Sequence, residues 1–225
     1  MDEVDSTQTI ASQHVREGKD TGIVFAYSQT AGKGRLGRTW HSDRGDSLTF
    51  SLIFHDYSDH EKPYLVGMAC ALAAAAAIHS QVRWPNDLLI GERKVGGILT
   101  ELIASPSGVR VPVVGIGINL NQVSFPLELN PIATSLAVEH GGRFDAKSIA
   151  KQILDRVTLL PEPADWSALA PIWNLLDRTP GKHYKLTNGD LATAVAVGSD
   201  AQLICSVNGE SQTVLAAEAL FGHAG

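Results

Sequence analysis

Apolar residues in the first 120 positions fall into short runs of strand length, separated by glycine, proline and charged residues. The runs at 22–27, 94–102 and 111–120 are rich in branched apolar side chains, which predicts buried strands, and the last is apolar enough to be a central strand. Residues 47–54 alternate polar and apolar side chains, which predicts a strand with one face in solvent. The pattern therefore favours a sheet of adjacent strands joined by tight turns.

Helical spacing of apolar residues appears at other places in the chain. Near the N-terminus, Asp5 or Ser6 can cap a helix that runs to Gly18, and Gln8 is placed for a capping box. Later runs repeat apolar residues every three or four positions, as an amphipathic helix does. The predicted helices span residues 5–18, 63–80, 145–160 and 166–176, with Ile149, Ile153 and Trp173 in the core.

The pattern of apolar and polar residues changes after Arg178. Short alternating runs surround two Asn-Gly pairs, at 188–189 and 208–209, and Asn-Gly between such runs is a strong hairpin signal. We expect an α+β fold in which helices flank a mixed sheet, followed by a small β-barrel or sandwich. The expected domains are residues 1–177 and residues 178–225, the second being the small C-terminal β-barrel.

Composition narrows the classes of function. A net charge of -6 and a pI near 5.7 argue against a nucleic-acid-binding surface. The longest apolar run, at 65–78, is too short to span a bilayer and no signal peptide is visible, so we expect a cytoplasmic protein without a membrane partner. Cys70 and Cys205 are interpreted as small buried side chains in a reducing compartment. The eight histidines are scattered, which predicts no metal site built from a protein cluster, and no G-x-S-x-G elbow marks a hydrolase.

The stretch 28–40 is the main candidate for ligand binding. It holds three glycines and three cations but no acidic residue, in a chain that is acidic overall. Glycines allow positive φ and the close approach of a ligand, and arginines donate paired hydrogen bonds to phosphate or carboxylate. We interpret the stretch as a flexible loop that closes on an anion, against the alternative of a solvated surface loop. The three glycines of the stretch are Gly32, Gly34 and Gly37, and the three cations are Lys33, Arg35 and Arg38.

The same stretch contains a G-x-G-x-x-G pattern, from Gly32 to Gly37, which is typical of dinucleotide-binding folds. Such folds need a strand directly before the glycines and a helix that opens on them. Here several residues separate the predicted strand from Gly32, and residues 38–45 have no helical periodicity. We therefore reject this interpretation.

Further polar positions lie where strands turn or end. A Trp-Pro pair makes the chain extended before Asn86 and Asp87, which either form an ordinary hairpin corner or serve a ligand. Lys94 either solvates an edge strand or meets a ligand beside the paired glycines that follow it. Asn119 ends an apolar run, where a strand end can face a cleft. Such a set can bind an anionic small molecule together with a nucleotide phosphate, with catalysis by positioning and charge neutralisation.

Five short motifs occur in order along the chain. They are Asp5-Ser6-Thr7; Gln29 with Gly32-Lys33-Gly34-Arg35, Gly37-Arg38 and Trp40; Trp84-Pro85-Asn86-Asp87; Lys94-Val95-Gly96-Gly97-Ile98-Leu99; and Gly115-Ile116-Gly117-Ile118-Asn119. In this order and spacing they resemble biotin–protein ligases of the monofunctional type, which lack a DNA-binding domain. Each motif alone is weak, but five in order are specific, and the resemblance covers nearly the whole chain.

The resemblance implies a ligase. Such an enzyme joins biotin to ATP, giving biotinyl-5′-AMP and pyrophosphate, and then passes biotin to a lysine of the biotin carboxyl carrier domain of a carboxylase such as acetyl-CoA carboxylase. It uses ATP, biotin and Mg²⁺. Residues 1–177 would be the catalytic domain that binds biotin and ATP, and a homodimer is compatible with the resemblance. The biotin carboxylate and ATP repel each other until cations neutralise them, and a loop that orders over both shields the labile anhydride from water.

The resemblance also implies which residues bind biotin. Ser6, Thr7 and Gln29 would bind the ureido ring or its surroundings, and the glycine-rich loop would fold over the carboxylate. The other biotin-binding residues would be Gly32, Lys33, Gly34, Arg35, Lys94 and Gly97.

Nucleotide binding and catalysis would fall to a second set. Trp40 would line the adenylate pocket, and Asn119 would close its nucleotide end. Asn86 and Asp87 would hold the nucleotide, its Mg²⁺ or the acceptor lysine, and Lys94 would contact carboxylate and phosphate oxygens during adenylation. In full, the ATP- or adenylate-binding residues would be Arg35, Arg38, Trp40, Asn86 and Asn119, and the catalytic ones Lys94, Arg35 and Asp87.

Several positions depart from the family pattern. Lys33 replaces the usual arginine, which keeps the charge but loses the fork. Gln8 stands where asparagine is common, and Arg83 where lysine usually precedes the Trp-Pro pair. The stretch 216–225 lacks an arginine that some members place near ATP, and the chain begins so close to Asp5 that we expect a preceding strand to be missing.

Three other functions compete with a biotin ligase. A biotin-responsive repressor would carry an N-terminal winged helix, but only four residues precede Asp5 and the chain is acidic, so we expect no nucleic-acid partner. A lipoate- or octanoate-protein ligase or transferase of related fold is a nearer rival, which the motifs at 84–87 and 32–35 disfavour. An adenylate-binding module without activity is the third.

Overall fold

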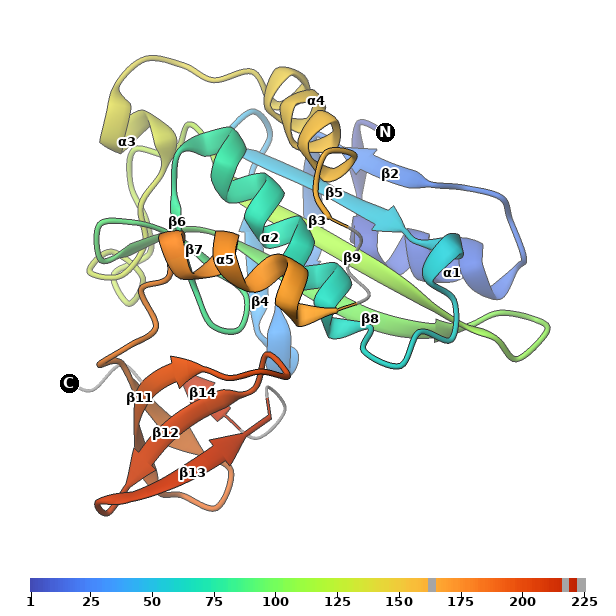
Figure 1. Ribbon diagram of the computed structural model, residues 1–225. Coiled ribbons are helices and arrows are strands. Elements are labelled where there is room, and N and C mark those ends of the chain that lie inside the picture. The colour runs from blue at the N-terminus through green and yellow to red at the C-terminus, as the bar shows by residue number, and fades with distance from the viewer. Residues whose placement is uncertain (162–164, 216–218, 222–225) are drawn as a thin grey trace.

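In the computed structural model, which describes residues 1–161, 165–215 and 219–221, the chain is organised around a six-stranded sheet (Figure 1). Its strand order is β2-β5-β9-β8-β7-β6, and each neighbouring pair is antiparallel. The predicted strands are confirmed, and the strand at 111–120 is central, as predicted. The strands are β2 (Ile23–Ala26), β5 (Ser47–Ile53), β6 (Gln81–Arg83), β7 (Asp87–Ile90), β8 (Arg93–Ala104) and β9 (Arg110–Asn119).

The two faces of this sheet differ in chemistry because side chains alternate along a strand. One face carries apolar side chains such as Phe50 and Ile116, which pack on the alanine-rich helix α2 (Tyr64–Ile78). On the other face β5 presents Ser47, Thr49 and Ser51, and all three are buried. The predicted solvent face of this strand is therefore wrong, because a buried polar face has the same alternation as a wet one.

The helices cover both faces of the sheet (Figure 1). Helix α1 (Thr7–Arg16) lies on the polar side, and α2 lies on the apolar side with α4 (Ala146–Val157) and α5 (Trp166–Leu176) packed beside it. The predicted helices and core residues are confirmed. The capping box is wrong: Ser6 takes the N-cap position without a side-chain capping bond, and the Gln8 amide points into the interior instead.

The glycine-rich stretch, predicted to be a loop, is a β-hairpin. Strand β3 (Ser28–Lys33) pairs with β4 (Thr39–Ser42), and a short 3-10 turn at Arg35–Gly37 joins them. Strand β1 (Glu3–Val4) runs parallel to β3, the parallel pair that makes the architecture mixed. Gly32 explains the close approach of the two arms, because a Cβ there would lie 2.4 Å from the Trp40 carbonyl oxygen.

The C-terminal part forms a five-stranded antiparallel sheet in the order β13-β12-β11-β10-β14. Within the described residues this sheet is open, so the predicted closed barrel is wrong, although the hairpins at both Asn-Gly pairs are confirmed. The stretch 216–225, noted for its lack of an arginine, lies outside the described residues except for 219–221. The strands are β10 (His183–Leu186), β11 (Leu191–Val197), β12 (Leu203–Val207), β13 (Glu210–Val214) and β14 (Ala219–Phe221).

One tryptophan ties the C-terminal sheet to the rest of the fold. The Trp84 indole Nε1 donates to the carbonyl of Ala201 at 2.8 Å, and the Tyr184 hydroxyl donates to the Trp84 carbonyl at 2.7 Å. Burial raises the pKa of Tyr184, so its hydroxyl stays a donor. Apolar residues of both parts belong to one buried core.

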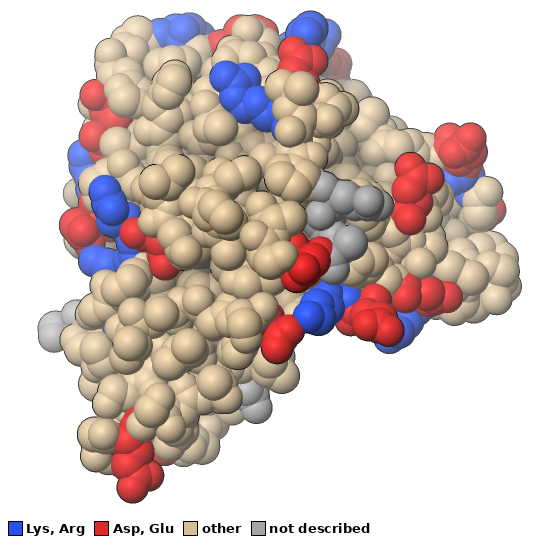
Figure 2. All heavy atoms as spheres, viewed as in Figure 1, with Lys and Arg blue, Asp and Glu red and all other residues tan. Residues whose placement is uncertain are grey.

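Figure 2 shows that the face over α5 and this sheet carries few charges. The division at residues 177 and 178 remains a prediction.

Candidate active site

A cleft of about 850 Å³ lies on the polar side of the main sheet, between the β3–β4 hairpin and the carboxyl end of β9. The structure brings nearly all predicted site residues to its walls; the exceptions are Gly32, which is buried in the hairpin, and Gly37, which is exposed in its turn. The sheet register places motifs that are distant in sequence side by side, since β9 pairs with both β5 and β8. The predicted residues that line the cleft are Ser6, Thr7, Lys33, Gly34, Gln29, Arg35, Arg38, Trp40, Asn86, Asp87, Lys94, Gly97 and Asn119.

One end of the cleft is polar and uncharged. The Gln29 Oε1 accepts from the Thr7 backbone N–H at 2.7 Å and lies 3.1 Å from the Thr7 hydroxyl. The Ser6 hydroxyl is buried without a hydrogen-bond partner in the described part of the chain. A buried hydroxyl without a partner is costly, so this end of the cleft suits a ligand that supplies hydrogen bonds.

The other end is built around a buried carboxylate. Asp87 accepts from Arg83 at 2.6 Å through one oxygen and pairs with Lys94 at 2.6 Å through the other. Burial by itself would raise the pKa of Asp87, but the two cations outweigh it and lower that pKa to about 2. Asp87 is therefore ionised at neutral pH and holds Lys94 at the cleft.

A bulge in β8 aims Lys94 at this carboxylate. Leu88 pairs with Gly96 and Leu89 with Lys94, so β8 carries one extra residue between these pairs. A Cβ on Gly97 would lie 3.2 Å from the Lys94 ammonium, which shows that the lysine crosses over the glycine. Strand β8 is an interior strand, so the edge-solvation interpretation of Lys94 is wrong.

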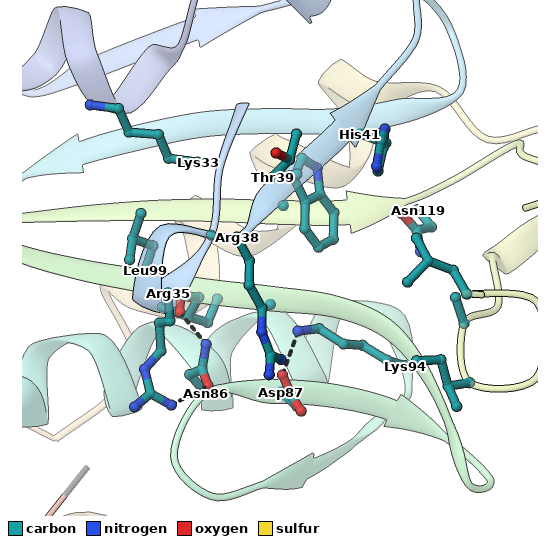
Figure 3. A pocket seen from close by; sticks show the side chains of 18 of the residues that line it. Lys33, Arg35, Arg38, Thr39, His41, Asn86, Asp87, Lys94, Leu99 and Asn119 are labelled. Atoms are coloured by element: carbon teal, nitrogen blue, oxygen red, sulfur yellow. Dashed lines mark hydrogen bonds and ion pairs between the residues drawn. The ribbon is translucent and has the colours of Figure 1, made fainter. Parts of the chain in front are cut away.

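The hairpin contributes two arginines above this carboxylate. Arg35 donates to the Asn86 side-chain oxygen at 3.1 Å, and Asn86 in turn donates to the Ile98 carbonyl at 2.7 Å. Burial lowers the pKa of Arg35, while the charge of Asp87 acts against that shift. Figure 3 shows Arg38 pointing from the hairpin toward the floor of the cleft and Lys33 turned away from it. Three positive side chains, those of Arg35, Arg38 and Lys94, therefore converge on one end of the cleft, and Lys33 does not join them.

A third region is aromatic and lies against β9. A Cβ on Gly117 would lie 2.6 Å from the Trp40 indole ring, so the ring packs on the glycine backbone. Asn119 donates to the Thr134 carbonyl at 2.9 Å and marks the far wall. This flat surface beside the cationic end suits a nucleotide base.

Replacing Gly117 by alanine should displace Trp40, because the new methyl group overlaps a rigid ring. We expect a stability loss of about 1–3 kcal/mol, the usual cost of overpacking, and a weaker affinity for ATP, the nucleotide that the resemblance implies. Gly22→Ala is the matched control, since a Cβ there meets nothing within 4 Å. Urea unfolding and ATP titration test both variants; a Gly117→Ala protein that matches Gly22→Ala in both would contradict this packing role.

Some residues at the cleft had no role in the sequence-based prediction. Arg83 buries its guanidinium on Asp87, and its spacing of four from that residue was the available signal. The segment 124–133 and the residues Lys182 and His183 also line the cleft. No local pattern marks them, because they reach the cleft only through the tertiary fold.

Two whole-chain features add to this picture. Within the described ranges, no three His, Cys, Asp or Glu side chains are grouped so that they could hold a metal ion. None of the helices in those ranges is both long and apolar enough to cross a bilayer.

Comparison with known proteins places the chain in a family. Residues 1–121 match the Biotin/lipoate A/B protein ligase family. The chain is 41% identical over 163 residues to the bifunctional ligase/repressor BirA of Bacillus spizizenii, covering 68% of this chain and 50% of that protein. It is 32% identical over 198 residues to the biotin--[acetyl-CoA-carboxylase] ligase of Paracoccus denitrificans, covering 76% and 75%. The chain thus spans about half the length of the Bacillus relative.

A solved structure shares the whole fold. The biotin protein ligase of Aquifex aeolicus, in complex with biotin and ATP, superposes with a TM-score of 0.74 at 26% identity, covering 98% of this chain and 96% of that one. The α+β fold and the C-terminal sheet are therefore those of a known architecture. With more than half of its residues matched, the chain belongs to the Biotin/lipoate A/B protein ligase family.

Proposed function

We propose that this chain activates biotin with ATP to form biotinyl-5′-AMP and then transfers biotin to a lysine of a carrier domain. The observation that carries the proposal is the division of one cleft into a hydrogen-bonding end and a cationic end. The first suits the ureido ring of biotin, and the second suits its carboxylate beside the phosphates of ATP. The Aquifex enzyme of the same fold binds both molecules.

In the first step a carboxylate oxygen of biotin attacks the α-phosphorus of ATP, and pyrophosphate leaves. Two anions must approach each other, so the step needs positive charge at the point of attack. Arg35 and Arg38 on the hairpin and Lys94 on β8 would supply it from opposite sides of the cleft. Their work is electrostatic, and no protein nucleophile takes part.

Asp87 has a positioning role in this proposal. Both of its oxygens are occupied by cations, and with a pKa of about 2 it is a weak base. It therefore orients the Lys94 ammonium, instead of taking a proton from the acceptor lysine. Asn86 similarly orients Arg35.

In the second step the amine of the carrier lysine attacks the acyl carbon of the adenylate. An amide bond forms, the amine loses a proton, and AMP leaves. The acceptor would be the biotin carboxyl carrier domain of a carboxylase; the name of the Paracoccus relative gives acetyl-CoA-carboxylase as its substrate. The homodimer, the cytoplasmic location and the lack of nucleic-acid and membrane partners remain predictions.

Among the described residues, no group of three carboxylate, histidine or cysteine side chains could hold a Mg²⁺ ion at the cleft, and the carboxylate at its cationic end is already paired. Asp87 is saturated by Arg83 and Lys94, and Glu92 on the rim pairs with Lys182. Mg²⁺ commonly keeps its waters and binds substrate phosphates, so we propose that it enters with ATP. No step above is assigned to it.

Pyrophosphate exchange into ATP tests the first step. We expect radiolabelled pyrophosphate to enter ATP only when biotin is present, and not with lipoate or octanoate in its place. Exchange with lipoate or octanoate alone would favour the related-fold ligase. The absence of exchange with all three acids would favour an adenylate-binding module without activity.

Amide exchange tests the closing of the hairpin. Residues 34–38 hold the turn, and Leu36 and Gly37 are exposed there with positive φ. We expect the amides of residues 32–44 to exchange quickly in the free protein and to be protected by biotinyl-5′-AMP. The amides of α2 are the control and should not change. Equal protection of the hairpin in both states would contradict its role as a lid.

A further inference from the structure

A series of buried and partly buried hydrogen bonds runs beneath the polar end of the cleft. The Gln8 amide nitrogen donates to the Glu101 carboxylate at 3.0 Å and to the Val113 carbonyl at 3.1 Å. The Ser51 hydroxyl donates to the Gln8 amide oxygen at 3.0 Å, and the Thr7 hydroxyl lies 3.0 Å from that of Ser51. The path links a carboxylate on β8 to a side chain that lines the cleft.

The partners of Gln8 determine which way its amide points. The Glu101 carboxylate and the Val113 carbonyl only accept hydrogen bonds, so they must face the NH₂ group. The flipped amide would place its oxygen against two acceptors in the interior, which is costly. The amide oxygen therefore faces Ser51 and takes its proton.

The number of available protons then determines the direction in which the Thr7 hydroxyl donates its hydrogen bond. Ser51 has one proton, and it is committed to Gln8. The proton of Thr7 has two acceptors within reach, the hydroxyl of Ser51 and the side-chain oxygen of Gln29, and both belong to the protein. In either case Thr7 presents only lone pairs to the cleft.

The fold makes room for this arrangement at a glycine. A Cβ on Gly115 of β9 would lie 2.8 Å from the Gln8 amide oxygen and 3.6 Å from the Ser51 hydroxyl. A larger residue there would push the amide out of line.

We propose that Glu101 is a positioning residue, which acts through Gln8 and Ser51 to make Thr7 a hydrogen-bond acceptor and thereby selects acids that carry an N–H donor. This rests on the proposed function. The ureido ring of biotin carries N–H groups, whereas lipoate and octanoate carry none. An acid without the donor leaves the lone pairs of the buried Thr7 hydroxyl without a donor, which disfavours the binding of that acid.

Glu101→Met tests the role of the carboxylate, because methionine has a similar length and no hydrogen-bonding oxygen. We expect the Kd and the KM for biotin to rise about tenfold, with kcat at saturating biotin and the KM for ATP unchanged. Glu17→Met is the matched control: Glu17 also accepts from a glutamine amide, Gln13, at 2.7 Å, but on the exposed side of α1. It should bind biotin as the wild type does.

Gln8→Met breaks the same path at its next link and guards against a Glu101 variant that folds poorly. It should raise the Kd for biotin similarly, and adding Glu101→Met to it should change nothing further. Additive losses, an unchanged Kd, or equal changes in biotin and ATP parameters would overturn the proposal. A wild-type protein that binds no biotin overturns the proposed function itself, so the two failures are distinguishable.

Discussion

Lys94→Ala should slow the formation of biotinyl-5′-AMP about 30- to 1,000-fold, or by roughly 2–4 kcal/mol in the transition state. The lysine is the charge that the β8 bulge aims into the cleft, and Asp87 holds it there at 2.6 Å. Its loss removes a stabilising contact where negative charge from two substrates meets. Single-turnover adenylation, followed by quench and chromatography, measures the rate.

The control for this experiment is Lys151→Ala. Lys151 also pairs with an aspartate, Asp155, at 2.7 Å, but on the exposed surface of α4. We expect it to adenylate biotin at the wild-type rate. An unchanged rate in Lys94→Ala would remove Lys94 from the catalytic set, whatever its effect on stability.

Asp87→Asn should destabilise the folded protein by about 3–5 kcal/mol, the cost of removing one partner from a buried ion pair. The asparagine leaves Arg83 buried with its charge poorly compensated, because Arg83 is only 7% exposed at the side chain. Urea unfolding at neutral pH measures the loss. A matched change at the exposed pair, Asp155→Asn, should stay close to the wild type.

The same residue gives a pH dependence with a definite sign. The pKa of Asp87 is lowered on folding from 3.8 to about 2, so its contribution to stability is full above pH 3.8 and is lost as the pH falls toward 2. The shift corresponds to about 2 kcal/mol. We expect the unfolding free energy of Asp87→Asn to fall less steeply than that of the wild type across this window. Parallel curves would contradict the ion pair.

The sequence predicts the order of elements well where periodicity is strong. The apolar run 111–120 was identified as a central strand, and it lies between β5 and β8. The alternation of polar and apolar residues in 47–54 also predicted a strand. It could not distinguish a strand face in solvent from a strand face that lines a cleft, since both favour small polar side chains. Ser51 was therefore placed in solvent, whereas it lies in the buried path beneath the cleft.

The candidate site was likewise predicted only in part from the sequence. Motif residues such as Lys94 and Asn86 were found because they belong to short contiguous patterns, and the structure brings them together at one cleft. Their partners were not found, because contacts between elements that are distant in sequence leave no trace in local order. Glu101 is an example: it meets Gln8 across 93 positions of sequence.

The indole of Trp84 makes the far end of the chain a part of the site. Trp84 lies two residues before Asn86; its indole donates to the carbonyl of Ala201, and its backbone carbonyl accepts from the hydroxyl of Tyr184. Truncation before residue 183 would remove both hydrogen bonds and expose the indole. The turn at Asn86 and Asp87, which orients Arg35 and Lys94, would then lose its support. Under the proposed function, an intact C-terminal sheet is in this sense a condition for substrate turnover, even though His183 alone among its described residues lines the cleft.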